Sequence, residues 1–362
     1  MHKKILQSLL FFFFTLSVSS FCQNNAVPTN IILYIGDGMG VSQVSAEKLT
    51  RGKINLERFK SVGLLTTYSA SDFVTESAAA ATAMATGFKT YNGALSVSTD
   101  QKPLKTVFEY AEEDGKSTGV IATCTITHAT PAAFLVHVPG RNEHAEIAEQ
   151  IVSSGVDVII GGGWAYFVPD SVEDSKRDDS KYLLKDLEQR MPVVRSLEQF
   201  RNVKDVDKLA AFLAPVHLPK ALERNYGLAE LTSKAIEILS KNNAGFMLMV
   251  EGSQIDWAGH DNNLVDILAE MNDFDAAVGV GLDFAEKNGN TLVVVTADHE
   301  TGGFAINNGS LETREITDAG FTTGSHTAVM VPVFAYGPGE EGFTGIQDNT
   351  IVGKRLIELL TK

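Results

Sequence analysis

Short apolar runs alternate with amphipathic segments along most of the chain. Amphipathic segments with helical spacing occupy 104–115, 146–155, 228–242 and 266–289. Between them lie apolar runs of strand length, bounded by glycine or polar residues, at 30–38, 117–124, 156–163, 246–252, 291–299 and 331–339. Runs of this kind are typical of buried strands. Their alternation with helices predicts an α/β fold with a doubly wound, mostly parallel sheet and helices on both faces. Such a fold binds its ligand at the carboxyl ends of the strands.

Two segments interrupt this alternation. Residues 164–227 are rich in charge and contain four prolines. We interpret them as an insertion over the sheet. It could serve as a lid or as a subunit contact, and the sequence does not distinguish these two roles. Residues 301–325 are rich in Gly and Thr, which predicts a second irregular excursion. We therefore expect a single domain over residues 23–362 with an insertion at about 164–227.

The N-terminus has the pattern of a secretory signal. A basic start at His2, Lys3 and Lys4 precedes the apolar run ILQSLLFFFFTLSV and several serines. This predicts a signal peptide at 1–22 and a periplasmic or secreted protein. A retained anchor helix is an alternative. A lipoprotein attached through Cys22 is another, although the bulky Phe21 disfavours it.

Cysteine content and charge narrow the classes further. Cys22 and Cys124 are the two cysteines of the sequence, so signal removal leaves no pair for an internal disulfide. Stability is then expected from the core or from bound metal. The net charge of −15 argues against a nucleic-acid partner, which needs Lys and Arg against phosphate. It does not exclude a small anionic substrate, because a local cation can reverse the sign inside a cleft.

Acidic residues stand where three of the predicted strands stop. Asp37 follows IILYIG, Glu251 follows FMLMV, and Asp298 follows TLVVVTA with His299 beside it. In a doubly wound sheet these ends point to one side, so the four side chains are expected in one cleft. Carboxylates at such short distances repel one another, so their cluster indicates bound cations. Oxygen plus imidazole ligation suits zinc, and all-oxygen ligation suits magnesium.

Further ligand candidates have helical or loop positions. Asp256 and His260 are spaced i, i+4, which places them on one helix face, and His326 follows in GSHT. His137, His144 and His217 lack such a context. The loop IGDGMG lacks the third glycine of a dinucleotide fingerprint, so its glycines are expected to turn the backbone tightly and project Asp37.

Seven motifs in this order resemble the alkaline phosphatases. They lie between about residues 30 and 340, with a weak match over 164–227, and are IGDGMG, VTESAAAATAMATG, KTYNGAL, ATPAAFLVHVPGR, VEGSQIDWAGH, VVVTADHETGG and GSHTA. The resemblance implies hydrolysis of phosphate monoesters at alkaline pH through a phosphoserine. It also implies two Zn²⁺ ions and one Mg²⁺ ion, inorganic phosphate as product, and in many relatives a homodimer.

The resemblance assigns a role to each motif residue. The nucleophile corresponds to Ser77 and the phosphate-clamping arginine to Arg141. The zinc that activates water and holds the leaving group would have the ligands Asp256, His260 and His326. The zinc that activates the serine would have Asp37, Asp298 and His299. The third metal would have Asp37, Thr130 and Glu251.

Two positions depart from the best-known bacterial pattern. His128 stands where that pattern has an aspartate near the third metal, and Trp257 stands where it has a lysine. We hypothesise that His128 either ligates the third metal, favouring zinc or cobalt, or lies beside it and weakens magnesium binding.

Other functions remain open from sequence alone. A phosphodiesterase of the same superfamily would need room that Arg141 is expected to fill. A sulfatase would need a cysteine or serine in a C/S-x-P-x-R setting, which Cys124 lacks. A non-catalytic periplasmic phosphate- or metal-binding protein explains the ligands but not a nucleophile-type serine beside both sets of zinc ligands.

Overall fold

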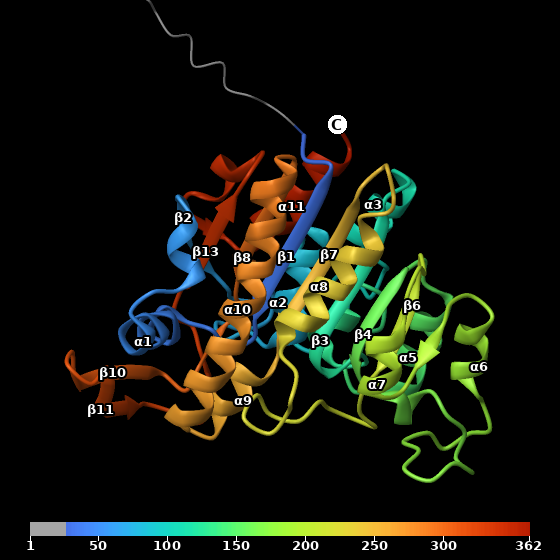
Figure 1. The fold of residues 1–362 in the computed structure, drawn as a ribbon, viewed down its shortest axis with the longest axis horizontal. Helices are drawn as coiled ribbons and strands as arrows, with labels where there is room; N and C mark the ends of the chain where they lie inside the picture. The colour runs from blue at the N-terminus through green and yellow to red at the C-terminus, as the bar shows by residue number, and fades with distance from the viewer. Residues whose placement is uncertain (1–26) are drawn as a thin grey trace, which may run out of the picture.

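A computed structural model describes residues 27–362. The predicted signal peptide at 1–22 lies outside these residues. Across the described part, ten strands form one sheet in the order β14-β2-β13-β8-β1-β7-β3-β4-β6-β5 (Figure 1). The strands of this sheet are β1 Asn30–Gly36, β2 Ser61–Thr66, β3 Ser117–Thr125, β4 Val158–Gly162, β5 Val193–Val194, β6 Leu209–Phe212, β7 Phe246–Gly252, β8 Thr291–Thr296, β13 Val331–Tyr336 and β14 Gly345–Asp348. The predicted α/β class and mostly parallel sheet are confirmed.

The sheet is parallel except around one strand. β13 runs antiparallel to both β2 and β8, whereas the other pairs in this sheet are parallel. All residues of β1, β7 and β8 are buried, which explains their uninterrupted apolar sequences. The central strands thus carry almost no amphipathic signal of their own.

Helices cover both faces of the sheet. α8 and α10 pack together on one face, and α2, α3 and α11 pack together on the other (Figure 1). The helices are α1 Val41–Arg51, α2 Ser77–Thr86, α3 Val107–Glu113, α4 Ala129–Ala132, α5 His144–Ser153, α6 Leu183–Glu188, α7 Leu197–Asn202, α8 Leu228–Leu239, α9 Gln254–His260, α10 Leu264–Asn288 and α11 Thr350–Leu360, with 3₁₀ turns η1 Asn55–Arg58, η2 Trp164–Tyr166 and η3 Glu340–Phe343. Within residues 27–362, no helix combines the length and apolar character needed to cross a bilayer.

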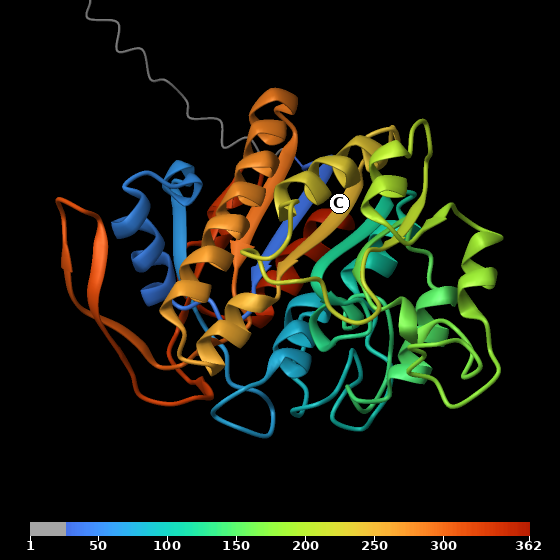
Figure 2. The ribbon, with the colours of Figure 1, turned by 60° about the horizontal axis from the view of Figure 1, so that its bottom comes forward.

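The two irregular segments differ from each other in structure. Residues 164–227 supply β5 and β6, which extend the sheet at its edge beyond β4. Their role as a lid or a subunit contact stays a prediction. The expectation of an irregular excursion over 301–325 was wrong. There, β10 Phe304–Ser310 and β11 Glu315–Phe321 form a hairpin beside α1 (Figure 2), and β9 Glu300–Thr301 pairs with β12 His326–Thr327. A two-stranded, mostly exposed hairpin needs little apolar alternation, so its sequence signal is weak.

Candidate active site

The acidic residues lie at the carboxyl ends of neighbouring central strands. Asp37 follows β1, Glu251 lies near the end of β7, and Asp298 follows β8. Because Ile35 pairs with both Glu251 and Thr296, the parallel register brings these ends to one level of the sheet. Gly38 (φ +76°) turns the chain sharply after Asp37, and a Cβ there would lie 2.6 Å from the Cα of Asp256. The structure therefore brings the three carboxylates together.

Asp37, Asp298 and His299 form the most deeply buried group. All three are fully buried, and one potential ligand atom from each lies within 4.8 Å of the others. His299 Nε2 is 3.2 Å from Asp298 Oδ2 and 3.6 Å from Asp37 Oδ1. Burial, followed by the charge of Asp298, raises the pKa of Asp37 well above its usual range. Among residues 27–362, no Lys or Arg pairs with these acids, and His299 is their ion-pair partner.

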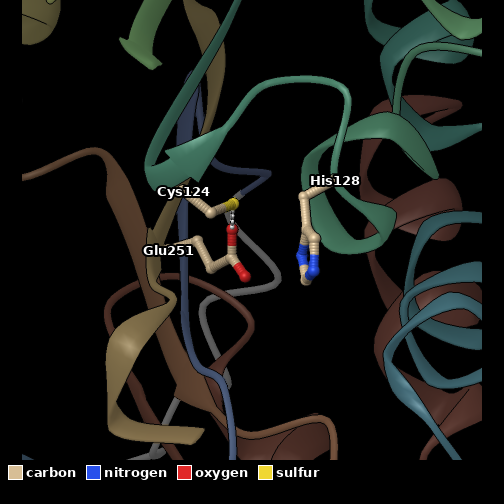
Figure 3. Close-up of side chains that lie close together, drawn as sticks. All are labelled: Cys124, His128 and Glu251. Carbon is tan, nitrogen blue, oxygen red and sulfur yellow. Dashed lines mark hydrogen bonds between the residues drawn. The ribbon is translucent and has the colours of Figure 1, made fainter. Parts of the chain in front are cut away.

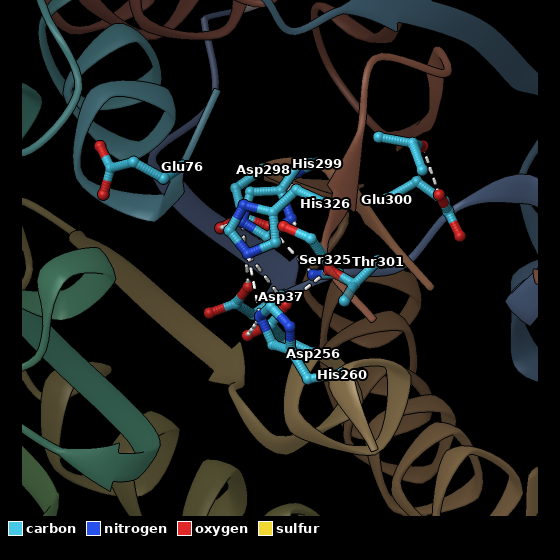
Figure 4. A network of polar contacts seen from close by, with 12 residues as sticks. Asp37, Glu76, Asp256, His260, Asp298, His299, Glu300, Thr301, Ser325 and His326 are labelled. Atoms are coloured by element: carbon cyan, nitrogen blue, oxygen red, sulfur yellow. Dashed lines mark hydrogen bonds and ion pairs between the residues drawn. The ribbon is translucent and has the colours of Figure 1, made fainter. Parts of the chain in front are cut away.

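Asp256, His260 and His326 form a second group (Figure 4), in which the aspartate is buried and the two histidines are half-buried. The Nε2 atoms of His260 and His326 are 3.1 Å apart, and each lies 3.4 Å from an oxygen of Asp256. Burial alone would raise the pKa of Asp256, but hydrogen bonds from both histidines hold it well below its usual range. The hydrogen bond to Asp256 raises the pKa of His260 to about 9.

Backbone and hydroxyl partners aim all three imidazoles the same way. His260 Nδ1 donates to the Gly324 carbonyl at 2.8 Å, and His326 Nδ1 donates to the Thr75 carbonyl at 3.1 Å. The Thr301 hydroxyl donates to Asp256 at 2.5 Å, so it accepts from His299 Nδ1, 3.2 Å away. In the neutral form of each imidazole the Nε2 lone pair therefore faces the site, which is the arrangement of metal-ligating histidines; in the protonated form His260 and His326 donate from Nε2 to Asp256 instead.

Cys124, His128 and Glu251 form a third group beneath the end of β3 (Figure 3). Glu251 is fully buried, and burial raises its pKa to about 7. Burial also lowers the pKa of His128 to about 3, so its imidazole is neutral. Thr130, which the resemblance assigns to the third metal, is fully buried in α4.

Ser77 is the first residue of α2. Glu76 caps this helix, because its carboxylate accepts from Ala78 N at 3.0 Å and from Ala79 N at 2.8 Å. All ten helix residues are buried, and the alanines allow close packing against α11, where a Cβ on Gly353 would lie 2.3 Å from Gly87 N. The alanine run therefore holds the first turn, with Ser77, in a fixed position under the cleft.

Ser77 and Arg141 open into one cavity of about 500 Å³. Arg141 pairs with the carboxylate of Glu76 and approaches His128 Nε2 at 3.3 Å. The second group forms part of the cavity wall. All the residues that line the cavity are Val74, Thr75, Glu76, Ser77, Asn92, His128, Arg141, Asp256, Trp257, His260, Ser325 and His326. His326 stacks on His299 with ring centroids 3.6 Å apart, so the buried first group lies directly beneath this wall.

Several contacts in the site were not predicted from the sequence. Glu76 both caps α2 and holds Arg141, and the one sequence signal for it is its place next to Ser77. Thr301, two residues after His299, orients two ligands at once. Cys124 was set aside for lack of a sulfatase motif, yet it belongs to the third group. His217 packs edge-on against Trp257, whereas His137 pairs with Glu109 away from the cleft.

The donor set fits bound cations. Among residues 27–362, the buried side-chain atoms without a hydrogen-bond partner concentrate here and include both oxygens of Asp37, Glu251 Oε1, Asp298 Oδ2, His299 Nε2, Thr130 Oγ1 and His128 Nδ1. Buried acceptors and carboxylates this close are costly unless a cation pairs them. The three groups of potential ligands contain six of the seven atoms just named, the exception being Thr130 Oγ1.

Comparisons with known proteins agree with this geometry. The alkaline phosphatase family profile matches residues 28–317. Alkaline phosphatase 3 of Bacillus subtilis is 35% identical over 91% of this chain and 88% of that protein. The solved alkaline phosphatase of the Antarctic bacterium TAB5 is 40% identical, with a TM-score of 0.85 over 92% of this chain and 99% of that one. A variant of the TAB5 enzyme with one histidine replaced by aspartate holds Mg in its M3 site.

Proposed function

The chain belongs to the alkaline phosphatase family and hydrolyses phosphate monoesters, and on this premise we propose that Ser77 is the nucleophile and Arg141 the phosphate clamp. The observation that supports both roles is their shared cavity, which Asp256, His260 and His326 also line. The nucleophile, an anion-binding guanidinium and a cation group thus face the same volume.

Metal dependence belongs to the family, and we propose two zinc ions for the imidazole-containing groups. Asp256, His260 and His326 would hold one, and Asp37, Asp298 and His299 the other. Bound there, zinc would lower the pKa of the serine hydroxyl and stabilise charge on the attacking and leaving oxygens. Magnesium in the M3 site of the TAB5 variant supports a third cation, for which Asp37, Thr130 and Glu251 offer oxygen ligands.

The side chains of the chain itself then have separate tasks. Ser77 Oγ forms a bond to phosphorus while the bond from phosphorus to the ester oxygen breaks, which gives a phosphoserine and the free alcohol. Arg141, held by Glu76, presents a planar fork that matches two phosphate oxygens. Ser77 is the first residue of α2, so the positive end of that helix dipole lies beside the same anion. Water then cleaves the phosphoserine to inorganic phosphate.

The nucleophile assignment is tested by Ser77→Ala. With an aryl phosphate at alkaline pH, we expect kcat to fall on the order of 10³-fold or more. Labelled phosphate should be trapped on the wild-type protein in acid and not on the variant. Ser153→Ala, at an exposed serine of α5, is the matched control and should leave both readouts unchanged. Retained labelling in Ser77→Ala would refute the assignment, and a wild-type protein without turnover would indicate a pure binding protein.

The diesterase alternative is tested by substrate choice. Arg141 reaches into the cavity beside His128, where a second ester group would need room. We therefore expect a higher kcat/KM for an aryl phosphate than for its methyl diester. A higher value for the diester would overturn the monoesterase as the main activity.

We also propose export of the protein and keep a homodimer as an expectation. The support is the basic and apolar pattern of residues 1–22 for export, and family resemblance for the dimer. Mass spectrometry of the mature N-terminus and sedimentation of the purified protein test the two points. The acidic net charge supports the expectation that nucleic acid is not a partner.

A further inference from the structure

Cys124 places a thiol inside the third cation group, where the family resemblance implied oxygen ligands alone. We propose that Cys124 Sγ is a direct ligand of the third cation, so that this site selects a thiophilic divalent ion such as zinc over magnesium. The proposal rests on the metal-dependent function above and adds a sulfur ligand to it, which gives the zinc preference hypothesised for His128 a second source. Cys124 lies in β3, two residues beyond Ala122, which pairs with Glu251.

The spacing of the donor atoms fits a small tetrahedral cation. Cys124 Sγ is 3.5 Å from Glu251 Oε2, and a His128 ring nitrogen completes a set whose members lie within 4.8 Å of one another (Figure 3). Zinc binds sulfur at about 2.3 Å and carboxylate oxygen at about 2.1 Å, so at an angle of about 109° the two ligands are about 3.6 Å apart. The observed separation of sulfur and oxygen therefore needs almost no adjustment.

The environment of the Cys124 thiol is typical of a metal ligand. Cys124 is fully buried, so it is not placed as a surface nucleophile. In the part of the chain that the structure describes, Glu251 Oε1, Thr130 Oγ1 and His128 Nδ1 are buried without hydrogen-bond partners close to it. These are independent signs of a ligand at this place, because buried polar atoms are rarely left unpaired.

Ligand chemistry then decides which cation fits. Magnesium takes oxygen ligands and retains water, whereas zinc accepts sulfur, nitrogen and oxygen together. Cys124, His128 and Glu251 supply one of each, and Asp37 is near enough for its charge to interact with Glu251. On binding the cation, the thiol releases its proton to solvent and coordinates as thiolate.

Cobalt(II) spectroscopy reads thiolate ligation independently of catalysis. The full chain is prepared in a Cys22→Ser background, which leaves Cys124 as the one cysteine of the sequence. Chelator-stripped protein is titrated with cobalt(II), and a strong near-ultraviolet sulfur-to-cobalt band is expected to appear with one of the bound equivalents. Cys124→Ser should bind the same number of cobalt ions without this band. Zinc at that site should also dissociate at least about 10-fold more readily in Cys124→Ser, since loss of even an outer-shell partner of a metal ligand typically costs about 10–100-fold in affinity.

The outcomes separate this proposal from the proposed function. Full cobalt loading of the Cys22→Ser protein without the band would overturn Cys124 as a ligand, and would leave the thiol as a hydrogen-bond donor to Glu251. This result holds even if Cys124→Ser fails to fold. A band that persists in Cys124→Ser would also overturn the proposal. Loss of phosphatase activity in Ser77→Ala bears on the nucleophile and leaves the cobalt band unaffected.

Discussion

Glu76→Gln is expected to weaken substrate binding by loosening Arg141. Glu76 Oε1 accepts from Ala79 N at 2.8 Å and Gly93 N at 2.7 Å, while Oε2 accepts from Ala78 N at 3.0 Å and from Arg141. Burial alone would raise the pKa of Glu76, but Arg141 and these N–H groups hold it below its usual range. The carboxylate is therefore charged in the working pH range.

The size of the effect follows from these contacts. Glutamine keeps one carbonyl oxygen, so whichever way its amide points, one pair of donors faces an NH₂ group. Each donor left unpaired costs about 1–3 kcal/mol, and water recovers part of this because the side chain is 17% exposed. We expect a loss of about 2–3 kcal/mol in unfolding free energy. We also expect a rise in KM of roughly tenfold, equivalent to about 1.4 kcal/mol, because Arg141 loses its charged partner.

Steady-state kinetics with an aryl phosphate and thermal unfolding of the same samples test both effects. Glu109→Gln is the matched control, because Glu109 accepts from Thr106 N at 2.7 Å in the capping box of α3, away from the cavity. The control should lower Tm and leave KM unchanged. A KM of Glu76→Gln within about twofold of wild type, with Tm lowered as in the control, would show that Glu76 only caps α2.

Three further predictions concern stability and metal. Burial raises the pKa of Glu47 from 4.5 to about 7. Protonation of Glu47 therefore stabilises the folded protein. This contribution to the unfolding free energy is complete below pH 4.5 and is lost as the pH rises through 7. The unfolding free energy of Glu47→Gln, measured by urea unfolding, should exceed that of wild type by at most about 3 kcal/mol at pH 8, and this excess should disappear near pH 4. A difference between variant and wild type that does not change with pH would contradict the raised pKa. Gly353→Ala places a Cβ 2.3 Å from Gly87 N, so Tm should fall by several degrees for a cost of about 1–3 kcal/mol, whereas unchanged Tm would mean that α11 shifts freely. A chelator should lower both activity and Tm while a phosphine reductant changes neither, and a Tm loss on reduction alone would point to a disulfide.

Most strands of the fold were predictable from local hydrophobic patterns in the sequence. The predicted strand at 246–252 coincides with β7, and the predicted run at 291–299 contains β8, because strands buried on both faces have continuous apolar sequences that are easily recognised. The antiparallel direction of β13 was not predictable, since an apolar run has no direction of its own. The hairpin of β10 and β11 was missed for the opposite reason, because its residues are mostly exposed.

The sequence by itself determined that acids and histidines follow the central strands, since that is a matter of order along the chain. The tertiary structure decided which of them share a cation. His326 reaches His260 across 66 positions, and Glu76 holds Arg141 across 65. Cys124 lies two residues beyond Ala122, the partner of Glu251 in the parallel register of β3 and β7, and only the fold brings its thiol to 3.5 Å from the Glu251 carboxylate. Sequence spacing fixes neither strand register nor the direction in which a side chain leaves the sheet, so these partnerships exist only in the folded chain.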